Sequence, residues 1–364
     1  MSQAFSILAL ILILGLVVII HEWGHFLLAK LNGVGVIEFS VGFGPRLFSF
    51  VKNGTRYSLK AVPFGGSCQL LGNDFGLSSD DPDVVHDDAH AFSKKNVWSR
   101  ISIIAAGPVF NFLLAYVLAV IVISFAGIDR PTVAGVMDGY PAAEAGLQAG
   151  DRITRINNTG IHLYRDVQLY TVIHEGEELS VTFVRDGEKM RTVITPVYSE
   201  EDGRYLLGIY GSGRTPTNWY ETLGYSWQEL RFNVKEVLDA LGMIFTGRLP
   251  LTSFSGPVGM AGAVNDIVDE VNADTAGESA LTTAYYMFLN LASFALMISA
   301  NLGVMNLLPI PAMDGGRLVF LFLEAIRGKP VPPEKEAIVH TAGILFLFGF
   351  MIFIMGHDIW SIFQ

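Results

Sequence analysis

The stretch that decides the fold is the apolar run AFSILALILILGLVVII at residues 4–20, which continues directly into HEWGH at residues 21–25. Residues four apart on a helix share a face, so His21 and His25 can bind one zinc ion. Glu22 is close enough in the chain to hold a zinc-bound water molecule and take its proton. Because ionisable side chains are costly at the end of an apolar span, these three residues are expected to be functional.

The composition is that of a membrane protein. Of the 364 residues, 51% are hydrophobic and 16% are charged, and the mean hydropathy is +0.43, whereas soluble domains carry about 25% charged residues. Four apolar segments approach the roughly 20 residues that a membrane-spanning helix needs: residues 4–20, extended past the motif by residues 26–29, and residues 101–126, 283–308 and 338–355. A cleaved signal peptide is the alternative for the first segment, which however has no basic start and no small-residue cleavage site.

Basic residues gather on one side of these segments. They are frequent in residues 26–100, and the loop between the third and fourth segments carries Arg317, Arg327, Lys329 and Lys335. The positive-inside rule then puts HEWGH towards the cytoplasm and both ends of the chain outside. The net charge of −11 argues against nucleic acid as a partner. Cys68, the single cysteine, is expected to be an inert thiol.

Two histidines and a water molecule leave a tetrahedral zinc ion one ligand short. Asp314 is the best candidate for that ligand, in NLLPIPAMDGG at residues 306–316. Pro309 and Pro311 break the third apolar segment, and irregular backbone at membrane depth is tolerated only where it lines protein or a watery cavity. The alternative is an ordinary Pro-Gly turn in which Asp314 caps a helix.

HEWGH together with NLLPIPAMDGG resembles the site-2 protease family of intramembrane zinc metalloproteases, peptidase family M50. The nearest branch is bacterial, of the regulator-of-sigma-E protease type, with a single PDZ domain. Met313 departs from the Leu that is frequent in the family. The resemblance covers nearly the whole chain through further motifs: GFGP at residues 42–45, PFGG at 63–66, FSKK at 92–95, AGPVFN at 106–111 and SGPVG at 255–259.

The resemblance implies a polytopic α-helical membrane protein with four transmembrane helices, a membrane-associated β-sheet and one extracytoplasmic α+β PDZ domain. His21, His25 and Asp314 would bind one zinc ion, and Glu22 would be the catalytic base. The implied substrate-binding residues are Asn111, Asn306, Pro309, Pro311, Gly42 and Gly44. For Asn111 a hydrogen bond to a neighbouring helix is an equal alternative.

The implied activity is regulated intramembrane proteolysis in the inner membrane of a bacterium. Single-span membrane proteins would be cut within the lipid bilayer after a prior extracytoplasmic cut. Anti-sigma factors and remnant signal peptides both fit as substrates. The sequence does not indicate the cleavage site or the oligomeric state.

The expected domains are residues 1–126 with the first two spans, 127–213 as the PDZ domain, 214–280 as an amphipathic helix and linker, and 281–364 with the last two spans. In the second of these we expect a strand at 132–137, a helix at 163–173 and a hairpin across Asp186-Gly187. YLLGI at residues 205–209 resembles a PDZ carboxylate-binding loop, so Leu207, Gly208 and Ile209 are candidates for binding a peptide. Whether this domain recognises a C-terminus or rejects bulky substrates stays open.

Three other stretches are interpreted as follows. Residues 36–63 predict a small β-sheet of three strands with a turn at GFGP, which could pair with an unwound substrate or be a plain cytoplasmic hairpin. Residues 218–246 predict an amphipathic helix, on the outer leaflet or against the PDZ domain. His86 and His90 have helical spacing but no apolar face, so a solvated loop is favoured over a second metal site.

Two other classes of protein compete with the protease. A PDZ scaffold with a dead metal site would lack a complete set of ligands and base, and this chain has all four residues. A transporter or proton relay built on buried His and Asp residues would be expected to show repeated halves, and no internal repeat is visible.

Overall fold

The computed structural model describes residues 3–72, 88–253 and 256–362. The chain forms two compact units. Unit 1 consists of Met1–Leu118 and Met243–Gln364, and unit 2 of Ala119–Gly242. His86 lies outside the described residues, so the solvated loop expected around His86 and His90 stays a prediction.

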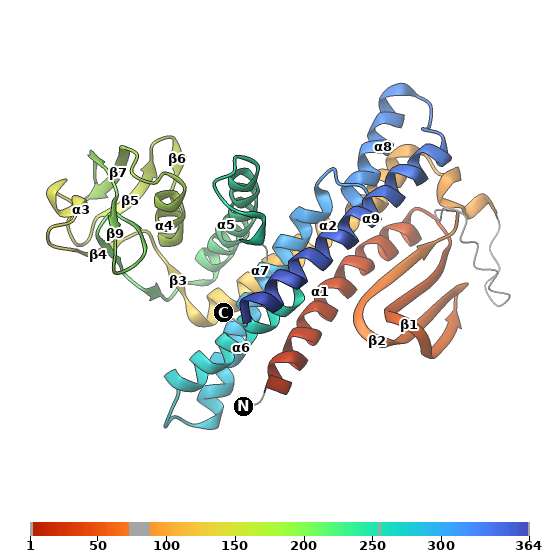
Figure 1. The fold of residues 1–364 in the computed structure, drawn as a ribbon, viewed down its shortest axis with the longest axis horizontal. Coiled ribbons are helices and arrows are strands. Elements are labelled where there is room, and N and C mark those ends of the chain that lie inside the picture. Colours follow the sequence, from red (N-terminus) through yellow and green to blue (C-terminus); the bar gives the residue numbers. More distant parts are fainter. Residues whose placement is uncertain (1–2, 73–87, 254–255, 363–364) are drawn as a thin grey trace. The chain divides into compact units, whose positions relative to one another are not determined.

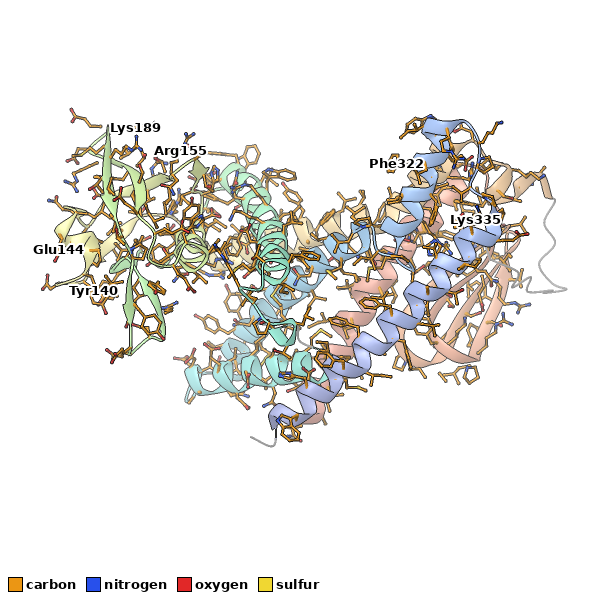
Figure 2. The ribbon with its side chains drawn as sticks, turned by 45° about the horizontal axis from the view of Figure 1, so that its top comes forward. Tyr140, Glu144, Arg155, Lys189, Phe322 and Lys335 are labelled. Carbon is orange, nitrogen blue, oxygen red and sulfur yellow. The ribbon has the colours of Figure 1, made fainter. Side chains whose placement is uncertain are left out.

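Four helices in the described part of the chain are long and apolar enough to cross a membrane (Figure 1), and they confirm the four predicted segments: α1 (Gln3–Leu31), α2 (Val97–Ala126), α7 (Ala280–Leu307) and α9 (Pro333–Ile362). Helix α1 continues without a break through HEWGH. Figure 2 shows few nitrogen or oxygen atoms along α9, whereas unit 2 carries many, for instance on Lys189 and Arg155. This contrast in polarity is what a bilayer around the long helices requires.

Unit 1 holds a further helix, α6 (Pro257–Asp274), in the stretch that the sequence assigned to a linker. Val264, Val268 and Val271 recur at helical spacing and are buried against α1 and α7. The backbone N–H of Gly259 donates to Asp358 Oδ2 of α9 at 2.9 Å. A Cβ on Gly256 would lie 2.7 Å from that oxygen, which explains the glycine of the SGPVG motif.

The predicted sheet is one long hairpin, β1 (Val36–Lys52) and β2 (Thr55–Leu70), which folds back on itself. Residues 38–41 run parallel to 56–59, whereas residues 46–51 run antiparallel to them, so the chain reverses its direction across GFGP, as the predicted turn requires. A second, tight turn joins β1 to β2 at Asn53-Gly54, both with the positive φ that such a hairpin turn requires. Gly42 and Gly44 lie inside β1 at this reversal, and their φ of +83° and +89° let the strand change direction. Residues 38–41 pair with 66–69 on one side and with 56–59 on the other.

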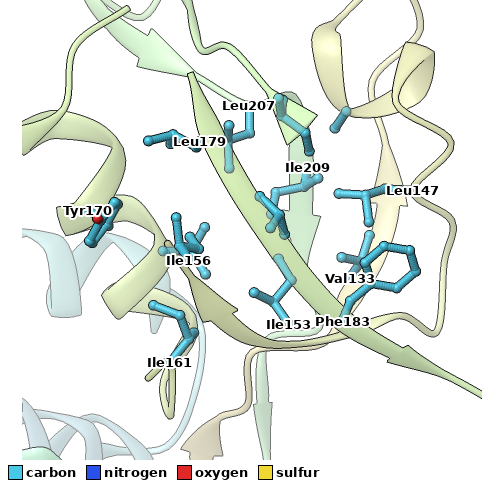
Figure 3. Packing of buried hydrophobic residues seen from close by; sticks show 14 residues of the cluster. Val133, Leu147, Ile153, Ile156, Ile161, Tyr170, Leu179, Phe183, Leu207 and Ile209 are labelled. Carbon is cyan, nitrogen blue, oxygen red and sulfur yellow. The ribbon is translucent and has the colours of Figure 1, made fainter. Parts of the chain in front are cut away.

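Unit 2 contains a four-stranded sheet in the order β6-β5-β7-β8 beside helix α4 (Tyr164–Ile173). The strand, helix and hairpin predicted there are confirmed by β4 (Val133–Val136), α4 and the β7/β8 pair. In Figure 3 the apolar side chains of the sheet, such as Ile153 and Phe183, pack with Leu207 and Ile209. The remaining elements are α3 (Pro141–Glu144), β3 (Ile128–Asp129), β5 (Arg152–Ile156), β6 (Thr159–Gly160), β7 (Leu179–Arg185), β8 (Glu188–Ile194), β9 (Val197–Ser199), β10 (Arg204–Leu206), β11 (Ile209–Gly211) and β12 (Arg214–Thr215).

Helix α5 (Trp219–Phe245) packs against this domain, so the compact unit extends past the predicted boundary at residue 213. Arg165 of α4 contacts Glu229 of α5 and Asp129 of β3, each at 3.0 Å. Burial alone would lower the pKa of Arg165, but these two carboxylates outweigh it and raise the pKa. Beside the buried face, α5 exposes the apolar side chains Trp219, Tyr220, Leu223 and Trp227.

Candidate metal centre

Helix α1 and the first residue of α8 (Asp314–Arg327) bring three predicted ligands together. The Nε2 atoms of His21 and His25 lie 3.2 Å apart. Asp314 Oδ2 lies 3.1 Å from His21 Nε2 and 3.2 Å from His25 Nε2. Among the described residues this is the one group of three His, Cys, Asp or Glu side chains that could hold a metal ion.

The hydrogen bonds around these side chains leave the lone pairs of His25 Nε2 and Asp314 Oδ2 facing each other. His25 Nδ1 lies 2.8 Å from the backbone oxygen of Ile103, which can only accept, so Nδ1 carries the proton and Nε2 offers its lone pair. Asp314 Oδ2 is buried and receives no hydrogen bond in the described structure. The N-cap of α8 is Met313, so Asp314 is not the cap that the alternative interpretation expected.

The three atoms fit a tetrahedral cation. Zinc bonds of about 2.0–2.1 Å separate neighbouring ligand atoms by roughly 3.3 Å, close to the 3.1 and 3.2 Å that Asp314 Oδ2 makes with the two histidines. One carboxylate and two imidazoles form a donor set that zinc accepts, with a fourth position left for water. The chemistry of the residues therefore fits the predicted cofactor.

Two glycines that the sequence analysis gave no role allow α1 and α2 to meet at this point. A Cβ on Gly107 would lie 2.4 Å from His25 Nε2 and 2.7 Å from His21 Cε1. A Cβ on Gly24 would lie 2.5 Å from the backbone oxygen of Ala106. Their place inside HEWGH and AGPVFN was visible in the sequence, but the contact between the two helices was not.

Asn111, a predicted substrate-binding residue, is completely buried on α2. Its carboxamide nitrogen lies 3.2 Å from His21 Nδ1, and its backbone oxygen accepts from Ser299 Oγ of α7 at 2.8 Å. Asn111 therefore lies behind the histidine, on the side of the ring opposite Nε2.

Beside the three ligands is a cavity of about 310 Å³. Its described lining includes Glu22, Ser67, Cys68, Asn306 and Arg317. The backbone N–H of Cys68 donates to the Glu22 carboxylate, so the end of β2 borders the catalytic candidate. Among the six predicted substrate residues, Asn306 belongs to the described lining of this cavity.

The other predicted substrate residues lie elsewhere in the described structure. Gly42 and Gly44 are in the bend of β1, where a Cβ on Gly42 would lie 2.4 Å from the backbone oxygen of Val62. Pro309 and Pro311 belong to the segment between α7 and α8. Gly315 and Gly316 make its turn possible, because a Cβ there would lie 2.0 Å from Leu308 O and 2.4 Å from Ile310 O.

Unit 2 contains a groove between α4 and the segment from β10 to β11. It is lined by all three predicted peptide-binding residues, Leu207, Gly208 and Ile209. The backbone oxygens of Leu207 and Gly208 accept from Ala142 N and Met137 N at 2.9 and 2.8 Å. The Tyr164 hydroxyl donates to the backbone oxygen of Ile209 at 2.8 Å.

The HEWGH helix, the third ligand Asp314 and the neighbouring Glu22 are the parts of a zinc metalloprotease centre. Residues 9–350 match the model of peptidase family M50, so the chain belongs to that family and is a zinc metalloprotease of the site-2 type. It is 37% identical to a zinc metalloprotease of Clostridium acetobutylicum, over 98% of this chain and 97% of that protein.

Two further relatives have more specific names. The chain is 33% identical to the zinc metalloprotease RasP of Bacillus licheniformis and 32% identical to the regulator of sigma-W protease RasP of Bacillus subtilis. Each comparison covers 98% of this chain and 99% of the relative. Among solved structures, the chain is similar to the PDZ domain of an SdrC-like protein of Listeria monocytogenes, at 24% identity over 24% of this chain and 90% of that chain, with a TM-score of 0.20.

Proposed function

We propose that this metalloprotease performs regulated intramembrane proteolysis, hydrolysing peptide bonds within the transmembrane segments of single-span membrane proteins after a prior extracytoplasmic cut. The observation that carries the proposal is the depth of the metal centre. At about 1.5 Å per residue, His21 lies roughly 27 Å from the start of α1 and roughly 15 Å from its end at Leu31. A site at that depth acts on segments that enter the bilayer.

His21, His25 and Asp314 would hold one zinc ion per chain. When bound, zinc supplies polarisation of the scissile carbonyl and a lowered pKa for water. Glu22 takes a proton from the attacking water and delivers it to the leaving nitrogen. The N–H of Cys68 keeps the Glu22 carboxylate in place for both transfers.

The partners of the two imidazoles keep them oriented as ligands. Ile103 O accepts the Nδ1 proton of His25. The oxygen and nitrogen of a carboxamide have nearly the same shape, so the group can be turned over and the two atoms exchange places. With its oxygen turned to His21 Nδ1, Asn111 accepts the corresponding proton there.

The hairpin would present the substrate. A helix hides its peptide carbonyls, so the substrate must unwind near the site and can then pair as an added strand. Residues 66–69 pair with 38–41 on one side, and no further strand pairs with them in the described part of the chain. Asn306 in the cavity would contact the unwound segment, while Gly42, Gly44, Pro309 and Pro311 would shape its path.

The exposed apolar side chains Phe43, Leu47, Phe48 and Phe50 favour a hairpin that dips into the bilayer. The proposed location is the inner membrane of a bacterium, with the metal centre towards the cytoplasm and unit 2 outside. The basic residues on one side of the spans support this orientation. The aromatic face of α5 would rest on the outer leaflet.

Unit 2 is proposed to act as a PDZ domain that selects substrates. Leu207, Gly208 and Ile209 would bind a peptide end in the groove, or the domain would exclude proteins with large external parts. One relative is named as a regulator of sigma-W protease, which favours an anti-sigma factor as the substrate. Remnant signal peptides are the second candidate.

The test is cleavage of a model single-span substrate without an external domain by the purified full chain in detergent. Wild type and Glu22→Gln are compared, and zinc is quantified in both. Cleavage by wild type alone, with about one zinc in each protein, supports the protease and the base. Equal behaviour of the two proteins without zinc would instead favour a scaffold or a proton relay.

A further inference from the structure

The segment that delivers Asp314 is irregular and held in an unfavourable conformation. Six residues, 308–313, join the end of α7 at Leu307 to Asp314. Ala312, two residues before the ligand, has a φ of +77°. A residue with a Cβ keeps a left-handed φ only where its surroundings determine it, so other parts of unit 1 must hold this segment.

Helix α9 supplies such a contact through His340. The backbone N–H of Ala312 donates to His340 Nδ1 at 2.9 Å. The imidazole is 5% exposed, and its centroid lies 5.7 Å from the ring of Phe320 on α8. Glu336 Oε1, one turn earlier on α9, lies 3.8 Å from His340 Nε2. The ring is therefore fixed on several sides and accepts a hydrogen bond from the strained residue.

A second contact from the same helix follows one turn later. A Cβ on Gly343 would lie 2.5 Å from Pro311 Cβ and 2.6 Å from the backbone oxygen of Pro311. Helix α9 therefore approaches residues 311 and 312 so closely that only glycine fits at position 343. The two contacts differ in chemistry, one being a hydrogen bond and the other a steric fit.

We propose that His340 is a positioning residue for the metal centre, and that with Gly343 it makes α9 the support of the third ligand. His340 is neither one of the three ligands nor part of the cavity's described lining, but it contacts Ala312, which lines the cavity. It acts through the backbone: by holding Ala312 it fixes the start of α8 and with it Asp314 Oδ2. The apolar pattern of α9 predicted only a membrane span, and the two contacts add a structural role for this helix at the metal centre. The inference rests on the proposed zinc site.

The first test measures the dissociation constant for zinc by competition with a chelator, using the full chain in detergent. Three proteins are compared: wild type, His340→Leu and His340→Asn. Loss of a group that orients a ligand lowers metal affinity by about 10–100-fold, which we expect for His340→Leu. The oxygen of asparagine can accept the Ala312 N–H, so His340→Asn should recover most of the affinity. A merely space-filling role would give the opposite order, because leucine keeps more apolar volume than asparagine.

The second test uses the steric contact and a matched glycine. Gly343→Ala pushes against Pro311, whereas Gly349→Ala, on the same helix, has nothing within 4 Å of its added methyl group. We expect Gly343→Ala to weaken zinc binding and lower kcat for the model substrate, with KM unchanged, and Gly349→Ala to match wild type. This pair keeps the inference testable even if His340→Leu fails to fold.

The outcomes separate this inference from the proposed protease. Wild-type zinc affinity in both His340→Leu and Gly343→Ala would overturn the role of α9 and leave the protease intact. Equal losses in Gly343→Ala and Gly349→Ala would also overturn it, because they would show a general effect on the helix. A wild type that binds no zinc would overturn both proposals.

Discussion

The metal centre of unit 1 and the groove of unit 2 differ in their hydrogen-bond acceptors, which lack a described donor in the first and are paired in the second. In the metal centre, Asp314 Oδ2 faces the Nε2 atoms of His21 and His25, and no described donor reaches it. In the groove, the backbone oxygens of Leu207, Gly208 and Ile209 each accept a hydrogen bond from the chain itself. The first arrangement is stable only around a cation, while the backbone oxygens of the second are already paired within the chain.

A buried charged residue of unit 2 is also paired within the chain, unlike Asp314 in the metal centre. Asp151 is fully buried, yet it accepts from Arg185 Nε and Nη2 at 2.7 Å each and from Gln148 N at 2.8 Å. Buried charges that are paired stabilise a fold, whereas buried lone pairs that converge without a partner mark a binding site. Substitutions in the two regions should therefore affect different properties of the protein.

The largest effect is expected from Asp314→Asn. The change keeps the shape of the ligand but removes its charge, so zinc affinity should fall by more than the roughly 100-fold seen when only a supporting group is lost. Cleavage should fall by at least about 1,000-fold. Zinc content and cleavage are measured together. Asp274→Asn, at the exposed end of α6, is the matched control and should behave as wild type. Full zinc in Asp314→Asn would contradict the ligand assignment.

The next largest effect is expected from Gly107→Ala. The added methyl group would lie 2.4 Å from His25 Nε2, so the imidazole must move or α2 must retreat from α1. We expect zinc affinity to fall by about 10–100-fold, as for other losses of ligand orientation, and Gly262→Ala, which has open space, to leave it unchanged. The two variants are compared by chelator competition. A Gly107→Ala protein with wild-type affinity would show that the helices adjust freely.

Much of this contrast could be predicted from the sequence, because it depends on local spacing. His21 and His25 are one turn apart on a continuous apolar helix, and Asp314 follows a break made by two prolines. The four long helices and the hairpin of unit 2 have periodic patterns of ordinary length. In each case the informative residues are near one another in the chain.

What the sequence did not reveal depends on contacts between distant segments. Gly107 approaches His25, and His340 approaches Ala312, from other helices. Helix α6 has only three buried valines among acidic residues, so its pattern was too weak to predict. The reversal at GFGP was predicted from its glycines, but the pairing of residues 38–41 with both 66–69 and 56–59 was not.

A smaller effect, on stability and not on zinc, is expected from Asp151→Asn in unit 2. Burial raises the pKa of Asp151, but the hydrogen bonds from Arg185 and Gln148 outweigh it and hold the pKa below the usual 3.8. Since the folded pKa is the lower one, the charged group contributes stability above pH 3.8, and this contribution is lost as the pH falls through the folded pKa. Removing the charge should cost about 2–3 kcal/mol of local stability at neutral pH.

Hydrogen exchange of residues 147–156 in the full chain, corrected for intrinsic rates, measures this stability. Protection in wild type should decrease as the pH falls below 3.8, and Asp151→Asn should show a weaker dependence. Zinc affinity at neutral pH should be the same in both proteins. A loss of zinc in Asp151→Asn would show that the two regions are not independent.

The smallest effect is expected from Tyr164→Phe, which gives the groove an unpaired acceptor like the one in the metal centre. The change removes the hydroxyl that donates to Ile209 O. That oxygen faces a groove open to water, so a solvent molecule can replace the hydroxyl, and local stability should fall by only about 0.5–1 kcal/mol. Hydrogen exchange of residues 204–211 measures the loss.

Because burial raises the Tyr164 pKa, the hydroxyl stays a donor at neutral pH and the comparison needs no correction for ionisation. A loss above about 2 kcal/mol would place Ile209 O among the buried acceptors that water cannot reach, and the groove would then be as dependent on a partner as the metal centre is.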